Sequence, residues 1–544
     1  MDRRSLFKAV GTAALVGAVG SVIAKPGSVL PRAAAQPIWH ELFAQWVPEI
    51  FEPVPDAPQH TEAIVIGSGF GAAVTALRLA QAGVATTVLE RGSRWPNDPR
   101  REIFTGDDLP DGRGFWHTTS FTGVTKVPMQ FADFGGVLDC TSYPGIDVWR
   151  GAAVGGGSVI FTGAMIAPER RLFDHVFGGV VDYGELERVY YPRVRSMLRL
   201  DPMPADIYHS SPFSHSRAWD DQVSKAGYRP VPNDSIFNWD VLRGELNGST
   251  RPSATVGRSN LGNSNGAKFD LNQNYLKDAQ AGGKARIFPG HRVDAIAEEP
   301  GGRFAVTVSK LHPTGVVIGT RTITCDKLFL GAGSIGTSEL LVRARETGAL
   351  PRLNEHIGDG WGTNGDVVLA RGASSVAGNG QGVPSASRIY DDSGTALTLE
   401  NWYIPGIPFE TGALASLAVV LDPTRTRFGF DRATGGVGLS WPTRAQEEVT
   451  AAALAVDRRI AERAGALAEY SALGYDANAL FTAHPLGGAV LGKATDSYGR
   501  VHGYRGLYVM DGAGIPGSTA TANPSLTITA LAERNIEAII REGR

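Results

Sequence analysis

A continuous apolar run at residues 63–66 is typical of a strand buried on both faces of a parallel sheet. Apolar residues then recur at the spacing of one helix face, at Ala73, Ala76, Leu77 and Ala80, and this pattern stops at Gly83. A second strand is predicted over Thr86–Leu89. The order strand, helix, strand predicts a β-α-β unit of a parallel sheet.

The turn between the first strand and the helix carries a nucleotide-binding pattern. Gly67, Gly69 and Ala72 form the motif G-x-G-x-x-A, and Glu90 follows the second strand, 23 residues after Gly67. Glycines let the backbone approach a pyrophosphate, and the helix N-terminus favours its charge. An acid at this spacing contacts a ribose hydroxyl. The residues expected to bind a dinucleotide here are Gly67, Gly69, Phe70, Gly71, Ala72 and Glu90.

Two further glycine-rich stretches follow. The stretch GAGSIG at 331–336 opens a helix after the apolar run 328–330, but no second strand ending in an acid follows it at the spacing of a ribose contact. Its predicted role is close strand–helix packing beside the first site. The stretch VGGGS at 154–158 can bring backbone donors to the flavin end of a long cofactor, and a plain flexible loop fits it equally well. Its candidate contacts are Gly155, Gly156, Gly157 and Ser158.

The end of the chain predicts a strand and a long helix. Residues 507–517 read as a strand that runs into glycines, with Asp511 and Gly512 at its end, where ligands of open α/β sheets gather. The helix after it is predicted to have Asn523 at the N-cap and Pro524 at the first helical position. Asn523 is either a cap alone or part of a positive helix end aimed at a flavin ring.

The stretch AHPLGG at 483–488 places His484 on a stiff turn with little bulk around it. Pro485 restricts the backbone of His484, and the two glycines allow close backbone approach. Such a turn is a poor setting for a packed core residue. The imidazole is therefore expected to face a ligand.

Composition and charge limit the class of protein. The chain has 544 residues, enough for two or more domain-sized cores, and 42% hydrophobic with 20% charged residues is ordinary for a globular protein. Residues 1–35 carry a net charge of +4, which leaves about −7 for the remainder and argues against a nucleic-acid partner. Cys140 and Cys325 are too few for a disulfide framework, and both one bridge and two free thiols stay open.

The N-terminus reads as a targeting segment. Arg3 and Arg4 precede Ser5-Leu6-Phe7-Lys8 as in a twin-arginine signal, and an uncharged stretch then leads to small residues placed for cleavage. This stretch is short and rich in alanine and glycine, so a membrane anchor fits less well. Residues 1–35 are expected to be a signal peptide that exports a folded, cofactor-loaded protein, so the mature protein is expected to be secreted.

These motifs together resemble the glucose–methanol–choline (GMC) family of flavin oxidoreductases, and within it the secreted bacterial cholesterol oxidases. The resemblance rests on GSGFGAA, VGGGS, LFLGAGSIGTSELLVRARETG, HPLGG and GRVHGYRGLYVMDGAGIPG leading to NPSLTITALAERN, in this order. It covers roughly residues 57 to 541 and is thin between 370 and 475.

The resemblance implies an α/β fold with two domains. A Rossmann-like FAD-binding domain is expected from residues 57–95, 270–355 and 495–544, and an α+β substrate-binding domain with an antiparallel sheet from residues 96–269 and 356–494. It implies non-covalent FAD, to which Val293 also contributes a contact, and it implies no metal.

The resemblance also implies the chemistry. His484 and Asn523 would flank the reactive face of the flavin, and Glu400 would move a proton in double-bond isomerisation, although alone it reads as a solvated strand acid. The implied reaction oxidises a cholesterol-like 3-hydroxysteroid to the ketone, with O2 giving H2O2 and a 5-ene to 4-ene shift. A transient contact with a membrane surface would supply the sterol.

Four residues depart from the cholesterol oxidase pattern near the flavin: Phe161, Thr162, Ala483 and Ser525. One residue is also inserted between Gly512 and Asn523. These departures leave open a GMC-type dehydrogenase or oxidase for a non-sterol apolar alcohol, and a flavin- or sterol-binding protein without turnover. The pairing of His484 with Asn523 argues against the last of these.

Overall fold

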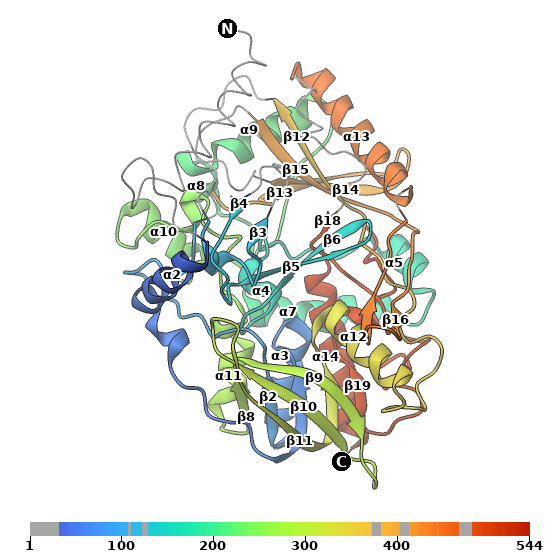
Figure 1. Cartoon of the computed structure of the whole chain (residues 1–544). Coiled ribbons are helices and arrows are strands. Elements are labelled where there is room, and N and C mark those ends of the chain that lie inside the picture. The colour runs from blue at the N-terminus through green and yellow to red at the C-terminus, as the bar shows by residue number, and fades with distance from the viewer. Residues whose placement is uncertain are drawn as a thin grey trace.

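The computed structural model describes residues 32–106, 110–121, 129–372, 382–402, 413–442, 444–466 and 481–543. Figure 1 shows two layered halves, with a large sheet near the C-terminus and a second sheet at the far end of the molecule. The predicted signal peptide lies outside the described residues up to residue 31, and helix α2 begins at Arg32. No helix among the described residues is long and apolar enough to span a bilayer.

The large sheet has seven strands in the order β8-β2-β1-β11-β10-β9, with β19 paired to the end of β11. Strands β8, β2, β1, β11 and β19 are parallel neighbours, and β9 and β10 extend the sheet antiparallel. The strands are β1 (His60–Ile66), β2 (Thr86–Leu89), β8 (Ala285–Phe288), β9 (His291–Glu298), β10 (Phe304–Leu311), β11 (Val317–Leu330) and β19 (Leu507–Val509). Three distant chain segments therefore build one sheet.

Helices cover both faces of this sheet. Ala63 and Val65 of β1 pack with helices α3 (Phe70–Gln81), α11 (Tyr275–Ala281) and α14 (Ser525–Glu542). Ile64 and Ile66 pack on the other face with α12 (Gly333–Glu346). Burial on both faces explains the continuous apolar run of this strand, and the predicted β-α-β unit is confirmed.

The second sheet is antiparallel, in the order β12-β15-β14-β13-β7. Its strands are β7 (Val231–Pro232), β12 (Asp366–Gly372), β13 (Ser387–Asp391), β14 (Leu397–Trp402) and β15 (Ala413–Val420). Helices α9 (Ser214–Lys225) and α13 (Ala445–Ala464) cover one face. The other face packs an apolar cluster against Phe481 and Trp149, which brings it towards the centre of the molecule.

Smaller elements connect the halves. A three-stranded sheet joins β5 (Leu138–Tyr143), β6 (Ile146–Gly151) and β18 (Phe481–Thr482), and two hairpins join β3 (Ser120–Phe121) to β4 (Met129–Gln130) and β16 (Gly429–Asp431) to β17 (Gly436–Gly438). The remaining helices are α2 (Arg32–Trp46), α4 (Gly157–Ile160), α5 (Arg170–Phe177), α6 (Tyr183–Glu185), α7 (Tyr191–Leu198), α8 (Ala205–Tyr208) and α10 (Trp239–Asn247).

The expected fold class is confirmed: a Rossmann-like sheet from separate segments joins an α+β unit with an antiparallel sheet. The exact domain boundaries stay a prediction. Cys140 and Cys325 are both free thiols, so the single bridge does not form in this structure.

The start of the C-terminal helix corrects one expectation. Helix α14 begins at Ser525, and Pro524 takes the N-cap position with its carbonyl accepting the Ile528 N–H at 2.8 Å. The N-cap role predicted for Asn523 is therefore wrong by one position, and the helix has no side-chain cap. The fixed φ of proline, −79° here, allows this start. The Asn523 amide is consequently left for another purpose.

Candidate active site

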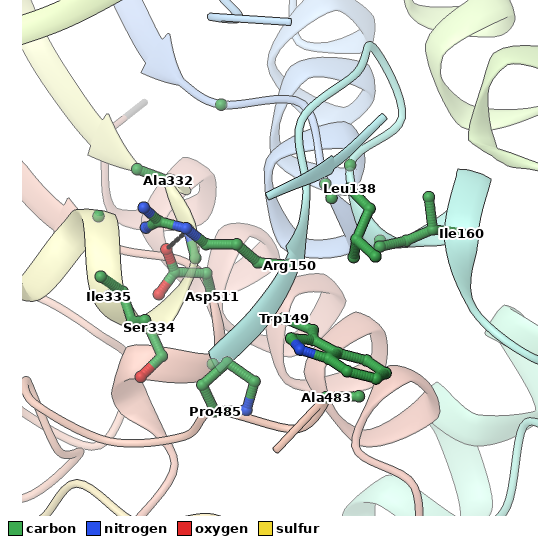
Figure 2. A pocket seen from close by; sticks show the side chains of 18 of the residues that line it. Leu138, Trp149, Arg150, Ile160, Ala332, Ser334, Ile335, Ala483, Pro485 and Asp511 are labelled. Atoms are coloured by element: carbon green, nitrogen blue, oxygen red, sulfur yellow. Dashed lines mark hydrogen bonds between the residues drawn. The ribbon is translucent and has the colours of Figure 1, made fainter. Parts of the chain in front are cut away.

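A cavity of about 440 Å³ lies at the carboxyl ends of β1, β11 and β19. This is where open α/β sheets bind ligands, and the volume lies in the range of small-molecule sites. Figure 2 shows Leu138 and Ile160 on one side of the cavity, and Ala332, Ser334 and Ile335 on the other. Residues of the second sheet, Trp402 and Leu417, also line it, so both halves of the molecule form its walls.

The glycines of the dinucleotide motif have two different tasks. A Cβ on Gly67 would lie 2.2 Å from the Gly331 carbonyl oxygen, and one on Gly71 would lie 1.6 Å from that of Met510. These positions admit only glycine because neighbouring strands and helices touch there. A Cβ on Gly69 would meet nothing within 4 Å, so its face is open to the cavity at the start of α3. The predicted packing role of GAGSIG is confirmed by the contact at Gly331.

Glu90 lines the cavity at the end of β2, where the sequence predicted a ribose contact. Its Oε2 accepts a hydrogen bond from Ser68 Oγ at 2.6 Å, and its Oε1 accepts one from the Gly92 N–H at 2.9 Å. Burial raises the pKa of this carboxyl, and the two donors oppose the rise. Ser68 also accepts the Gly155 N–H at 3.0 Å, so it ties the acid to the loop at 154–158. Sequence reasoning passed over Ser68, which occupies a variable position of the motif.

The loop at 154–158 is a shaped turn rather than a plain flexible loop. Gly155 and Gly156 have positive φ values of 103° and 53°, and a Cβ on Gly156 would lie 2.7 Å from the Gly69 Cα. Gly156 and Gly157 line the cavity. Gly155 and Ser158 do not line it; Ser158 Oγ donates to the Gly155 carbonyl at 2.7 Å and holds the turn from behind. The backbone of this loop therefore contacts the backbone of the dinucleotide motif at Gly69.

The remaining predicted cofactor contacts also fall into residues that line the cavity and residues that pack behind it. Val293, Gly512 and Pro524 line the cavity, while Ala72 lies behind it and packs against Gly331. Asp511 also lines it, and its carboxylate accepts the Gly333 and Ala513 N–H groups, each at 2.9 Å. Burial raises the pKa of Asp511 to about 6.

His484 and Asn523 both line the cavity, from separate segments. His484 Nδ1 lies 2.7 Å from Oδ1 of Asp366, a carboxylate with no exposed surface. Burial alone would lower the pKa of His484, but the charge and hydrogen bond of Asp366 outweigh it and raise the pKa. Asn523 is 3% exposed, and its Oδ1 has no hydrogen-bond partner among the described residues. An unpaired buried amide oxygen beside a cavity needs an explanation, and a hydrogen bond from a bound ligand would supply one.

Glu400 is fully buried on β14, so the reading of a solvated strand acid is wrong. Neither carboxylate oxygen has a hydrogen bond of ordinary geometry among the described residues, and the nearby Ser385 side chain only partly opposes the effect of burial on the pKa. Burial raises its pKa to about 7. Glu400 does not itself line the cavity, but it pairs across the sheet with Leu417 and shares a strand face with Trp402, and both of these do.

Aromatic side chains form much of the wall away from the dinucleotide motif. Trp149 packs on Phe481 with ring centroids 4.4 Å apart, and Phe121 lies 5.4 Å from Trp149. The large apolar lining residues of this wall include Phe115, Phe121, Trp149, Trp402, Leu417 and Phe481. The four departures from the cholesterol oxidase pattern, Phe161, Thr162, Ala483 and Ser525, also line the cavity.

The residues fit an FAD group. Open space faces Gly69 and the start of α3, and a Cβ on Gly157 would come only within 4.0 Å of Phe70. Glu90, for which the sequence predicts a ribose contact, lines the same cavity, and so does the start of α14. Within the described ranges, no group of three His, Cys, Asp or Glu side chains gathers to hold a metal ion.

The chain is similar to known proteins in sequence and in fold. Residues 438–532 match the family model described as GMC oxidoreductase. The chain is 26% identical to a cholesterol oxidase of Mycobacterium tuberculosis over 87% of this chain and 90% of the relative, and 23% identical to one of Acinetobacter baumannii over 87% and 93%. Among solved structures, a pyridoxine 4-oxidase has a TM-score of 0.61 at 16% identity, covering 88% of this chain and 99% of that one. A fungal aryl-alcohol oxidase has a TM-score of 0.59 at 14% identity, covering 90% and 100%.

Proposed function

Because the chain carries the C-terminal domain of the GMC oxidoreductases and is an FAD-dependent alcohol oxidase, we propose that it oxidises a cholesterol-like 3-hydroxysteroid to the ketone. O2 is the acceptor and H2O2 the second product. One observation carries the substrate class: the cavity joins a polar end, with His484 and Asn523, to a wall of large aromatic and aliphatic side chains. Such a cavity suits a large apolar molecule that carries one hydroxyl group.

The polar end provides the groups that an alcohol needs for oxidation. His484 Nε2 accepts the hydrogen bond of the substrate hydroxyl and takes its proton, as a base whose pKa is raised by the charge and hydrogen bond of Asp366. The Asn523 amide N–H₂ donates to the same hydroxyl oxygen and orients the carbinol carbon. When bound, FAD supplies the two-electron acceptor for the carbinol hydrogen and its electron pair.

Four chain segments would hold this cofactor. The backbone around Gly69 and the start of α3 would hold the pyrophosphate, and Glu90 the ribose. The turn at Gly156 and Gly157 and the start of α14 would face the flavin end. The two histidines on the described wall, His291 and His484, are not in the loop at 154–158. We therefore propose that FAD is bound without a covalent link.

Glu400 is proposed as the base of a second step, the shift of a 5-ene to a 4-ene ketone. A carboxyl with a pKa of about 7 can both accept and return a proton near neutral pH. Its position beside Leu417 and Trp402 places it next to the apolar wall, where a steroid ring system would lie.

The sterol is proposed to come from a membrane surface by a transient contact. Residues 1–35 are proposed to direct export of the folded protein.

A test of the substrate follows the flavin absorbance without O2 while 3-hydroxysteroids, aromatic alcohols and short aliphatic alcohols are added. A 3-hydroxysteroid should bleach the flavin fastest, and the matching 3-ketosteroid serves as the unreactive control. Admitting O2 should restore the colour with one H2O2 for each turnover. Bleaching by small alcohols alone would refute the steroid assignment, and reoxidation by dyes but not by O2 would indicate a dehydrogenase.

A further inference from the structure

We propose that Asp366 is a positioning residue for this oxidation, because its carboxylate holds His484 with the proton on Nδ1 and leaves Nε2 to take the substrate proton. The proposal rests on the proposed function of His484 as the base. Sequence reasoning gave no hint of Asp366, which lies 118 positions before His484.

The carboxylate of Asp366 lies at the start of β12 and has no exposed surface. Its Oδ1 contacts His484 Nδ1 at 2.7 Å. Its Oδ2 accepts hydrogen bonds from Thr482 Oγ1 at 2.9 Å and from the Ala483 N–H at 3.1 Å. Thr482 Oγ1 in turn accepts the His484 N–H at 2.9 Å. One buried acid therefore fixes both the imidazole ring and the backbone that leads to it.

The protonation state follows from the donors around the carboxylate. An ionised carboxylate has no hydrogen to donate, so a short contact with Nδ1 requires the proton to lie on Nδ1. Nε2 is then the lone-pair nitrogen. In the proposed reaction the hydroxyl proton would move to Nε2, and bound FAD would supply the acceptor for the carbinol hydrogen and its electron pair as the C=O bond forms. The resulting imidazolium faces a carboxylate, which stabilises its charge.

Two nearby carboxyl groups affect the pKa of His484 and therefore the pH dependence of the proposed oxidation. The titratable groups that act on His484 are Asp366 from β12 and Glu400 from β14, and both raise its pKa, Asp366 by more. Glu400 also titrates near neutral pH, and Arg388 from β13 lies opposite it in the sheet. Removing the Glu400 charge with Glu400→Gln isolates the effect of Asp366 on His484.

The substitution Asp366→Asn tests the proton position because the site imposes an orientation on the new amide. The Ala483 N–H is a fixed donor at 3.1 Å from Oδ2, so the amide oxygen must occupy that side. The amide N–H₂ then faces Nδ1 of His484, which can accept only when its proton lies on Nε2. The near-isosteric variant thus places a hydrogen on the atom that must act as the base.

The experiment measures anaerobic flavin reduction between pH 5 and 9 in the Glu400→Gln background, with the best alcohol of the wild-type panel. Asp366→Asn should slow reduction by about 10²-fold or more, approaching the loss in His484→Ala, and should move the ascending limb of the profile to lower pH. The matched control is Asp457→Asn, which removes another fully buried carboxylate, paired with Arg371 at 2.5 Å on the far face of the same sheet. Asp457→Asn should leave the ascending limb of the pH profile at the same pH as in the Glu400→Gln parent.

The outcomes separate two failures. If His484→Ala reduces its flavin at the wild-type rate, His484 is not the base, and the positioning role proposed for Asp366 is wrong as well. If His484→Ala is slow but Asp366→Asn keeps the wild-type rate and pH limb, only the role of Asp366 is overturned. Nitrogen NMR of histidine-labelled wild-type protein, assigned with His484→Ala, gives a readout without turnover. The Nδ1–H form at His484 supports the proposal, and the Nε2–H form overturns it even if Asp366→Asn does not fold.

Discussion

Glu400 on β14 lies directly opposite Leu417 on β15, and Leu417 lines the cavity while Glu400 is sealed just beside it. An acid in this place lies beside the apolar wall and also within electrostatic reach of His484, whose charge opposes the rise that burial causes in the pKa of Glu400. The two proposed steps, alcohol oxidation and isomerisation, therefore use different side chains at one cavity.

The first prediction separates these steps. Glu400→Gln should keep alcohol oxidation within a few-fold of wild type, because the hydroxyl contacts are made elsewhere. The 5-en-3-one should then accumulate in place of the 4-en-3-one, which steroid absorbance and chromatography distinguish. Equal loss of both activities would show that Glu400 does not act as a separate base.

The second prediction concerns stability and pH. The folded pKa of Glu400 is about 7 against an ordinary 4.5. The folded state therefore holds the extra proton between these pH values, and the free energy of unfolding falls as pH rises through this window. Glu400→Gln lacks this titration, so it should be more stable than wild type at pH 8, by on the order of 3 kcal/mol, and the gap should close towards pH 5. Thermal unfolding at several pH values measures this, and a gap that does not change with pH would contradict it.

The third prediction uses a matched pair of glycines. Gly71→Ala places a methyl group 1.6 Å from the Met510 carbonyl oxygen and should destabilise the fold by about 3 kcal/mol or more. Gly69→Ala meets no protein atom within 4 Å and keeps an allowed φ of −70°, so the fold should survive. FAD binding should weaken about 10- to 100-fold, because the methyl group occupies the cofactor's space. Cofactor titration of the apoprotein checks this, and unchanged affinity in Gly69→Ala would place the pyrophosphate elsewhere.

The fourth prediction is that the purified protein is yellow and releases its flavin. Acid precipitation should leave FAD in the supernatant, because neither histidine on the described wall lies in the loop at 154–158. Flavin that stays with the precipitated protein would indicate a covalent link.

The local sequence predicted the dinucleotide half well because its rules are local. Strand, glycines, helix and acid follow one another within residues 60–90, and the structure has each in place. The start of α14 was misplaced by one residue, since an Asn-Pro pair allows either residue to precede the first turn.

The site residues of the substrate half were harder to predict from the sequence. All residues of β14 are buried, so no alternation marks Glu400 as internal. Asp366 belongs to no local motif, and only the fold brings it to His484. The aromatic wall likewise comes from separate segments, as the contact between Trp149 and Phe481 shows.

The last prediction concerns His484 itself. His484→Ala removes the atom that would take the hydroxyl proton, and a positioned base contributes about 10²–10⁴-fold to a rate. Anaerobic flavin reduction by the best alcohol should slow by that factor. FAD content should change little, because Gly69 and Glu90 lie at another part of the cavity. In the wild type, reduction should speed up as pH rises and His484 loses its proton, with the midpoint above its ordinary value of 6.5 because Asp366 raises the pKa. A near-wild-type rate in His484→Ala would make the histidine structural, and the proton would then have to leave by a different group.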